Sequence, residues 1–277
     1  MITETNEVYH ANTAISHSKL ETFRRRPVLY WKKFIARVLP PTEPSSAFRL
    51  GSAAHCAILE PSSFDSRYIE QPKFDLRTKD GKEQFALFSA ANAGKTLIDG
   101  DELQQVCSMA EAVRLNPLAS ELLSAGTPEL SWRTNGKLAL QCRTDWFNAT
   151  GCDLSGGKAY VADVKTVESL DSDSFRNFER AVFSYGYHRQ AGFYLPLLTE
   201  IIGSPVFNFF FIAVEKVEPF GVQVYRLSDD VIACGQDETI SDLTKLKRCM
   251  DNNDWPNLPH DMVQLGLPRW YTKESAQ

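Results

Sequence analysis

The segment at residues 161–166, Val-Ala-Asp-Val-Lys-Thr, is an apolar strand that carries two opposite charges. Because side chains alternate along a β-strand, Asp163 and Lys165 point to the same face, while Val161 and Val164 help to hold the strand in the core. Charges on a buried strand are costly unless they meet a partner. A salt pair at the strand end would satisfy them. A divalent cation with a phosphate would do so too, because Asp is a hard oxygen ligand and Lys a compact cation.

Neighbouring segments add carboxylates to this strand. Residues 138–147 alternate apolar and polar side chains and carry Asp145 near their end, and an earlier strand supplies Glu129. The intervening residues 148–158 are rich in Gly, Asn, Asp and Ser, which predicts a loop between antiparallel strands. Asp145 and Asp163 can then face each other, and two carboxylates at short distance are costly unless a cation lies between them.

Five short motifs occur in order along the chain. They are Ile-Ser-His-Ser-Lys-Leu at 15–20 with Pro27 and Tyr30, Leu-Gly-Ser-Ala-Ala-His at 50–55 with Leu-Glu-Pro at 59–61, Cys-Arg-Thr-Asp at 142–145, Asp-Val-Lys-Thr at 163–166, and Tyr-His-Arg-Gln-Ala-Gly-Phe-Tyr at 187–194. Their order resembles the PD-(D/E)XK nuclease superfamily, and more closely the RecE-type exonucleases of the exodeoxyribonuclease VIII family. The resemblance runs from about Ile15 to Trp270, and the loop 148–158 is longer and richer in Gly than that family leads us to expect.

This resemblance implies an α/β fold in which a mixed central β-sheet is flanked by helices. It also implies a metal-dependent exodeoxyribonuclease that degrades linear double-stranded DNA processively from 5′ to 3′ and leaves 3′ single-stranded tails for recombination. Mg²⁺ is the expected metal, and Mn²⁺ is expected to substitute for it. The resemblance further implies a bacterial or phage-encoded protein that forms a homo-oligomeric ring, such as a tetramer, binds DNA ends and works with a single-strand annealing protein.

The chemistry of phosphodiester hydrolysis assigns roles to the residues of these motifs. Asp145, Asp163 and the Val164 carbonyl are expected to hold the metal, which polarises the phosphate and activates a water. Lys165 is expected to hold that water or to stabilise charge on the phosphoryl oxygens. Glu129 is the third acid of the predicted site.

Three further candidates lie on segments that predict helices. His55 follows small residues, and a lone His in such a helix is more often a core side chain, whereas the resemblance places it beside the metal. It could bind the metal directly or hold a metal-bound water. Gln190 and Tyr194 fall one turn apart on one helix face. The helical pattern alone predicts a surface Gln190 and a core Tyr194, while the resemblance implies that both face the site.

The net charge of −5 argues against a nucleic-acid partner, but the distribution of charge matters more than its total. Residues 17–37 contain seven Lys and Arg residues and one acid. We predict a helical arm that contacts phosphates, and the alternative is a solvated basic face. The candidate DNA-binding residues are Arg24, Arg25, Arg26, Lys32, Lys33, Arg143 and Thr166.

The 277 residues contain no long linker, which predicts one nuclease domain over residues 15–277 after a flexible or loosely docked arm at residues 1–14. Residues 78–84 are charged and predict an exposed loop. The aromatic end around Trp270 is a candidate contact between subunits.

The composition also restricts where such a chain works. No run approaches the roughly 18 apolar residues that a membrane span requires, and the N-terminus lacks the apolar region of a secretion signal. The six cysteines form no CxxC pair, which favours reduced thiols over disulfides or a zinc site. We therefore expect a cytoplasmic protein without membrane contact.

Two other functions remain open on the same core. One is an endonuclease or single-strand nuclease, which would also cut closed circular DNA. The other is a non-catalytic DNA-binding module of a recombination complex, which would be expected to have lost an acid or the Lys. The sequence retains all of these residues.

Overall fold

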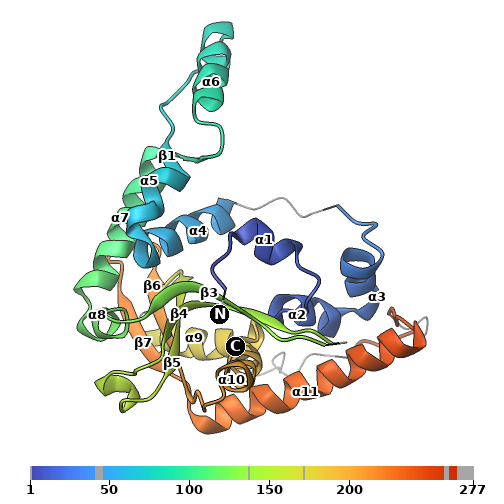
Figure 1. Cartoon of the computed structure of the whole chain (residues 1–277). Helices are drawn as coiled ribbons and strands as arrows, with labels where there is room; N and C mark the ends of the chain where they lie inside the picture. The colour runs from blue at the N-terminus through green and yellow to red at the C-terminus, as the bar shows by residue number, and fades with distance from the viewer. Residues whose placement is uncertain (1, 41–45, 137, 171, 259–261, 267–277) are drawn as a thin grey trace.

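The computed structural model describes residues 2–40, 46–136, 138–170, 172–258 and 262–266. Its centre is a five-stranded sheet in the order β3–β4–β5–β6–β7, flanked by helices (Figure 1). The β5–β6 pair is parallel and the other pairs are antiparallel, so the predicted mixed sheet and α/β class are confirmed. The strands are β3 Thr127–Arg133, β4 Gln141–Asn148, β5 Tyr160–Val167, β6 Asn208–Glu215 and β7 Val222–Arg226.

The helices cover both faces of this sheet, and a second, two-stranded parallel sheet lies outside it. The α-helices are α1 Asn6–Ala11, α2 His17–Arg25, α3 Pro27–Tyr30, α4 Ser46–Leu59, α5 Phe64–Arg67, α6 Lys79–Ala91, α7 Gly100–Leu115, α8 Pro117–Leu122, α9 Ser172–Ser184, α10 Tyr187–Ile202 and α11 Asp229–Asn252. The shorter elements are the π-helix η1 Trp31–Ile35, the 3₁₀-helices η2 Pro61–Ser63 and η3 Asp153–Ser155, and the strands β1 Tyr68–Glu70 and β2 Thr96–Ile98.

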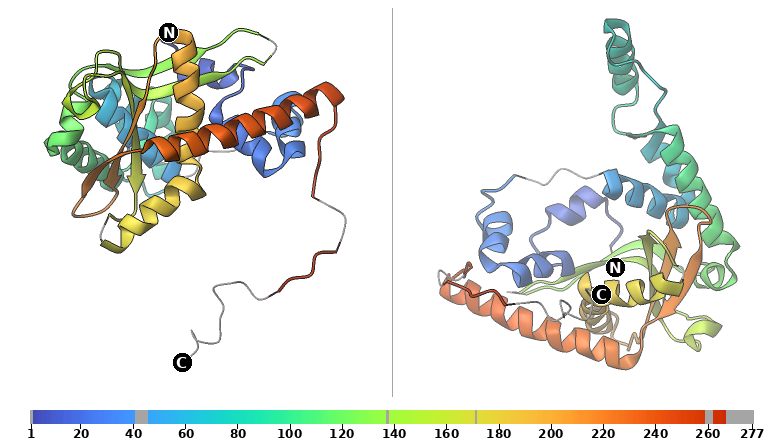
Figure 2. Two further views of the ribbon diagram at one scale, coloured as in Figure 1. Left: turned by 90° about the horizontal axis from the view of Figure 1, so that it is seen from below. Right: turned by 180° about the vertical axis from the view of Figure 1, so that it is seen from behind.

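Alternation along β5 assigns its side chains to two separate cores. Ala162 and Val164 pack with residues of α4, α7 and α8 on one face of the sheet. Val161 packs with α2, α9, α10 and α11 on the other face, where α10 and α11 lie side by side (Figure 2). Asp163 and Lys165 share the parity of Val161, so both point toward α10. Strand β6 is buried at every position.

The N-terminal residues predicted as a flexible or loosely docked arm are docked on the sheet over their described length. Ile2 forms a β-bridge with Ser131, and Tyr9 of α1 is buried. The guanidinium of Arg143 lies 5.3 Å from the Tyr9 ring centroid. Tyr9 is the buried residue of α1, and no local pattern in the sequence indicates this contact with the sheet.

The prediction of an exposed loop at residues 78–84 is wrong about the loop, because Thr78 caps helix α6 and residues 79–84 begin it, but apart from Gly81 these residues are exposed. Thr78 caps this helix by accepting a hydrogen bond from the Gly81 N–H at 3.0 Å, a signal at the sequence level that the high charge obscured. With β1 and β2, helix α6 projects away from the body of the molecule (Figure 1). The ring of Phe74 packs against those of Phe85 and Phe88 and stabilises this projection.

Three further expectations concerned the cysteines, membrane spans and the contact between subunits. All six cysteines are free. None of the helices in the described part of the chain combines the length and the apolar composition that crossing a membrane requires. Trp270, the predicted subunit contact, lies outside the described residues.

Candidate active site

Three acids lie in a row across β3, β4 and β5. The register of β3 and β4 places Glu129 opposite Asp145, and the register of β4 and β5, extended by one residue, places Asp145 opposite Asp163. Glu129 has a φ of 51°, a left-handed conformation that is costly for a residue with a side chain and that recurs at functional sites. The predicted antiparallel arrangement of the two aspartates is thus confirmed, with Glu129 in line with them.

The strands β4 and β5 diverge where the row of acids crosses them. Their paired residues end at Trp146 and Ala162, which leaves the next main-chain donors of β5 without a partner on β4. The Oδ2 atom of Asp145 accepts one of these donors, the Val164 N–H, at 2.9 Å. The divergence therefore fixes the Asp145 carboxylate between the two strands. A ligand role for the Val164 carbonyl stays a prediction.

His55 reaches the same place from helix α4. Its Nδ1 lies 3.3 Å from Asp145 Oδ2, and its side chain is 29% exposed, so it borders the acids instead of filling the core. Helix α4 approaches β5 closely at Gly51, where an added Cβ would lie 3.7 Å from the Thr166 hydroxyl. His55, Glu129 and Asp145 each offer one ligand atom, and these atoms lie within 4.8 Å of one another.

The electrostatics of this cluster favour a cation. Burial, followed by repulsion from Asp145, raises the pKa of Glu129 to about 8. Burial, followed by repulsion from Asp163, raises the pKa of Asp145 to about 6. Arg143 compensates only in part, because its Nε lies 3.6 Å from Glu129 Oε2. Two carboxylates that repel each other, with an imidazole nitrogen beside them, fit a divalent metal ion.

Two side chains, those of Lys165 and Gln190, contact the Asp163 carboxylate. Lys165 Nζ lies 2.5 Å from Asp163 Oδ2, and Gln190 Nε2 donates to Asp163 Oδ1 at 2.5 Å. The ion pair lacks hydrogen-bond alignment, so the buried Oδ2 has no hydrogen-bond donor among the described residues. The simple salt pair considered for Asp163 and Lys165 is present, but within a larger cluster. Because Asp163 lies outside the three-atom cluster of His55, its role as a metal ligand stays a prediction.

Lys165 is held in its charged form at the centre of the site. Burial alone would lower its pKa, but Asp163 and Asp145 outweigh burial and raise it. Its Nζ also donates to Gln190 Oε1 at 3.3 Å and lies 4.6 Å from the centroid of the Tyr187 ring. Gln190 thus lies at the site, as the resemblance implied.

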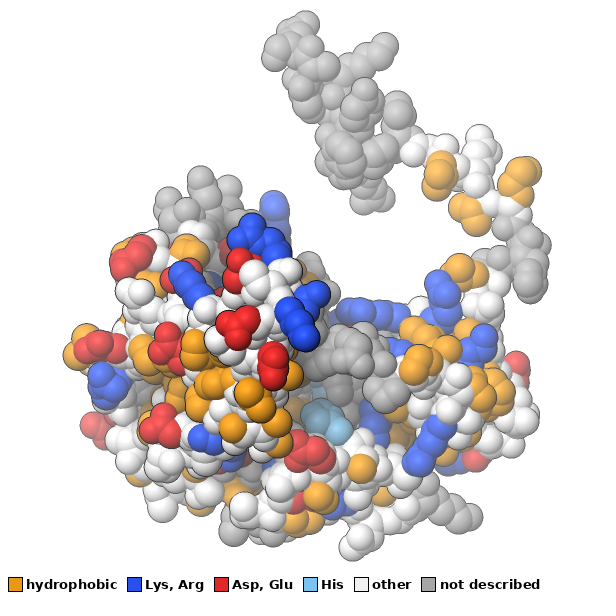
Figure 3. All heavy atoms as spheres, turned by 90° about the horizontal axis from the view of Figure 1, so that it is seen from above, with side chains coloured by type: hydrophobic (Ala, Val, Ile, Leu, Met, Phe, Trp, Pro, Cys, Tyr) orange, Lys and Arg blue, Asp and Glu red, His pale blue; other side chains and the backbone are white. Residues whose placement is uncertain are grey.

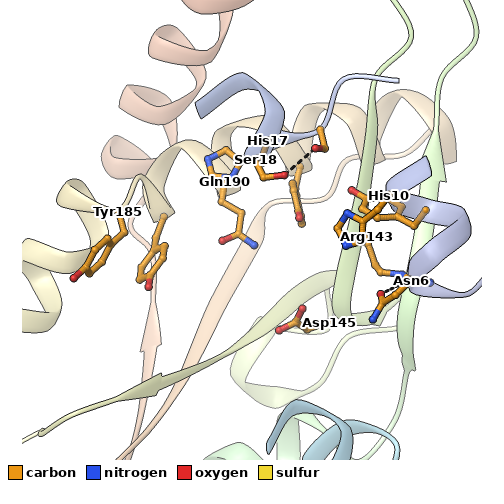
Figure 4. Close-up of a pocket in the computed structure, with 12 residues that line it drawn as sticks. Asn6, His10, His17, Ser18, Arg143, Asp145, Tyr185 and Gln190 are labelled. Carbon is orange, nitrogen blue, oxygen red and sulfur yellow. Dashed lines mark hydrogen bonds between the residues drawn. The ribbon is translucent and has the colours of Figure 1, made fainter. Parts of the chain in front are cut away.

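Of the three acids, Asp145 lines a cleft of about 330 Å³ (Figure 4). Tyr194, Gln190 and Arg143 of the predicted set line it together with Asp145. Figure 3 shows a histidine in the hollow between two lobes, with Lys and Arg side chains nearby. Residues of α1 and the α9–α10 turn also line the cleft, and sequence reasoning missed them because no local pattern joins them to the acids. These are Asn6, Tyr9, His10, Tyr185 and Tyr187.

The predicted DNA-binding residues do not all lie at the cleft. Of the described residues that line the cleft, Arg143 is the one member of that set. Arg24 is engaged by acids of α11, with ion pairs of 2.7 Å to Glu238 and 2.8 Å to Asp242. Arg25, Arg26 and Lys32 are exposed, Lys33 is half-buried, and Thr166 lies on β5 beside α4. Their contacts with DNA stay predictions.

A second group of metal-ligand types lies behind α10. His188, Cys234 and Glu238 have ligand atoms within 4.8 Å of one another. However, Arg189 and Arg24 both form ion pairs with Glu238, at 3.1 and 2.7 Å. Two guanidinium groups on the single carboxylate neutralise it, so this group does not fit a metal ion.

Comparison with known proteins places this geometry in a family. Residues 16–261 match the family model described as "PDDEXK-like domain of unknown function (DUF3799)". The chain belongs to this family. Membership confirms the PD-(D/E)XK superfamily and supports a nuclease-type hydrolase. The acids of a PDDEXK-like domain are suited to divalent metals, in agreement with the His55 cluster.

The fold of the PDDEXK-like domain also has a counterpart among solved structures. A protein from Eubacterium rectale, described as a "Putative exonuclease", superposes with a TM-score of 0.65 over 97% of each chain, at 13% sequence identity. At this identity the likeness shows the fold. No curated protein matches the sequence.

Proposed function

We propose that the protein is a Mg²⁺-dependent DNA exonuclease. The observation that carries this proposal is the row of Glu129, Asp145 and Asp163 with Lys165 held beside it, inside a PDDEXK-like fold. Buried acids whose pKa is raised by burial and by a neighbouring acid, as at Glu129 and Asp145, are unfavourable for folding, and a cation-dependent reaction gives a reason for keeping them together.

In this proposal the acids and His55 bind the metal, and Lys165 contacts the phosphate. Glu129, Asp145 and His55 would hold the metal, with Asp163 as a further candidate, and a bound divalent ion supplies Lewis-acid polarisation of the phosphate and a more acidic water. Lys165 keeps a positive charge directed at the phosphoryl oxygens because Asp163 and Gln190 fix its Nζ.

Arg143 fixes the opposite wall of the cleft. It donates to the Asn6 side chain and to the Glu4 carbonyl of the docked N-terminal segment. A guanidinium anchored in this way suits a DNA phosphate, because its planar fork loses little freedom on binding. The N-terminal segment therefore acts as part of the proposed DNA site.

The finer properties rest on the resemblance to RecE-type exonucleases. We propose degradation from 5′ to 3′ on linear duplex ends, 3′ single-stranded products used in recombination, and Mn²⁺ as a substitute metal. We also propose a homo-oligomeric ring, such as a tetramer, with a single-strand annealing protein as partner. Light scattering at micromolar concentration tests the ring, and a monomer that remains processive would contradict it.

The decisive experiment compares DNA substrates. Linear duplex labelled at the 5′ or the 3′ end and closed circular plasmid are each incubated with Mg²⁺ and with EDTA. We expect release of the 5′ label first, no cleavage of the circle, and no activity in EDTA. Cleavage of the circle would favour an endonuclease, and binding without cleavage in Mg²⁺ or Mn²⁺ would favour a non-catalytic module. The Lys165→Ala variant controls for contaminating nucleases.

A further inference from the structure

The cleft has two chemically different walls. Figure 4 shows Arg143, His10 and Asn6 on one side, Tyr185 on the other, and Asp145 between them. Tyr185 is 63% exposed although it lines a cleft in the centre of the molecule. An open aromatic face on the wall of a cleft offers a surface on which a flat, apolar group of a ligand can stack.

The Tyr185 ring belongs to a row that leads to the acids. It lies 5.8 Å from the Tyr187 ring, and the two rings are inclined by 36°. Lys165 Nζ lies 4.6 Å from the Tyr187 ring centroid and 2.5 Å from Asp163. The cation therefore covers the inner ring of the row, and Tyr185 is the outer, open ring.

The chain holds Tyr185 rigidly at this position. Its N–H donates to the Ala181 carbonyl at 2.9 Å, and Gly186 follows with a φ of 75°. A Cβ at Gly186 would lie 2.4 Å from Arg189 Nη2, and that guanidinium is itself anchored by two hydrogen bonds to Glu21. These contacts fix the backbone that carries the ring, and a Tyr side chain then has only two torsion angles to restrict when a ligand stacks on it.

We propose that Tyr185 is a stacking platform for an unpaired nucleobase of the strand being cut, next to the phosphate held by Lys165. This inference rests on the proposed nuclease function and specifies its substrate. A base within a duplex has both faces covered by its neighbours, so stacking on Tyr185 requires that the nucleotide leave the duplex. Duplex ends must therefore open at the site before cleavage.

The test couples a protein change to a substrate change. Single-turnover rates are measured for the wild type and Tyr185→Ala on DNA ends with a normal or an abasic terminal nucleotide. Removing the ring or the base should each slow cleavage by about 10-fold, because either change abolishes the stacking of the base on the ring. Removing both should cost no more than removing one, since the ring and the base act through the same interaction. Tyr185→Phe should retain the wild-type rate.

Phe207→Ala serves as the matched control. Its ring is 54% exposed and lies under Lys158, and it does not line the cleft. It should keep the wild-type rates on both substrates. If Tyr185→Ala cleaves the abasic end more slowly than either single change predicts, by the product of the two separate effects, the ring and the base act independently and the platform is refuted. A Tyr185→Phe variant as slow as Tyr185→Ala would also refute it, because the hydroxyl would then be the important group.

A binding measurement separates this inference from the nuclease activity. DNA with 2-aminopurine at its terminal position is titrated with protein in EDTA, where no cleavage occurs. The fluorescence should be quenched by the wild type and by Phe207→Ala, but not by Tyr185→Ala at equal DNA occupancy. Equal quenching by all three would refute stacking even in an active nuclease. Quenching by a wild-type protein that shows no cleavage in Mg²⁺ would support stacking on Tyr185 and contradict the proposed nuclease activity.

Discussion

Two clusters of charged side chains lie on opposite sides of helix α10 and show opposite electrostatic behaviour. On one side, burial raises the pKa of both Glu129 and Asp145, with repulsion from Asp145 adding to the first shift and repulsion from Asp163 to the second. On the other side, Glu21 accepts two hydrogen bonds from Arg189, at 2.6 and 2.8 Å. Burial would raise the pKa of Glu21, but hydrogen bonds from Arg189 and His17 outweigh it and lower this pKa to about 2.

The difference shows which cluster serves the fold and which serves chemistry. The Glu21 cluster joins α2, α10 and α11 and matches its three acids, Glu21, Glu238 and Asp242, with three cations, Arg24, Arg189 and Lys245. The row that contains Asp145 has three acids against two cations, Lys165 and Arg143, and this excess of acid does not stabilise the fold. Charge that the chain leaves uncompensated is available to bind a metal or a substrate.

The largest expected effect is on catalysis by the uncompensated cluster. Asp163→Asn should reduce the single-turnover cleavage rate by at least about 1000-fold at saturating DNA, because it removes a charge and releases Lys165 and Gln190. Asp242→Asn removes a buried carboxylate from the compensated cluster and should leave this rate within a few fold below its melting temperature. A rate for Asp163→Asn within about tenfold of wild type would contradict the site.

Neutralising one acid in each cluster should change the free energy of unfolding in opposite directions. Glu21→Gln should lower the free energy of unfolding by roughly 3 kcal/mol, because it leaves Arg189 short of a counter-charge. Glu129→Gln should raise it by about 1 kcal/mol, because at pH 7 folding requires the uptake of a proton by a carboxyl that is ionised in the unfolded chain, and Gln needs none. Urea unfolding at pH 7 in EDTA measures both, with the exposed Glu83→Gln as a control near zero. Equal signs would remove the distinction between the clusters.

Acid should weaken the compensated cluster. Because the folded pKa of Glu21 is about 2 and its ordinary value is 4.5, its contribution is present above pH 4.5 and disappears as the pH falls toward 2. The stability advantage of the wild type over Glu21→Gln should shrink by roughly 1–3 kcal/mol between about pH 5 and pH 2.5. Urea unfolding across this range measures it, and a constant advantage would show that Glu21 acts through packing alone.

The smallest effect concerns the basic arm. Arg25 and Arg26 are exposed, whereas Arg24 is paired with the acids of α11. Replacing Arg25 and Arg26 with Ala should reduce the slope of log affinity against log salt by roughly 0.9 for each phosphate that is no longer neutralised. Lys82→Ala on the projecting α6 is the control. An unchanged slope would identify the arm as a solvated basic face.

The local patterns of the sequence predicted the elements that carry the site. Period-two alternation located β5 and its paired charges, and the helical repeat placed Gln190 and Tyr194 one turn apart. Such patterns are visible because each depends on neighbours a few residues away. The start of α6 at Thr78 was missed although its cap is local, because a run of charges is compatible with both a loop and an exposed helix.

The sequence by itself determined which residues could do the chemistry: acids and a Lys at strand spacing, in an order shared with a nuclease superfamily. The tertiary structure alone decided their surroundings. The divergence of β4 and β5 gave Asp145 the Val164 N–H, α11 paired with Arg24, and docking of α1 brought Asn6 to Arg143. These contacts join residues up to 218 positions apart, so they follow from the packing of whole elements and leave no local signal in the sequence.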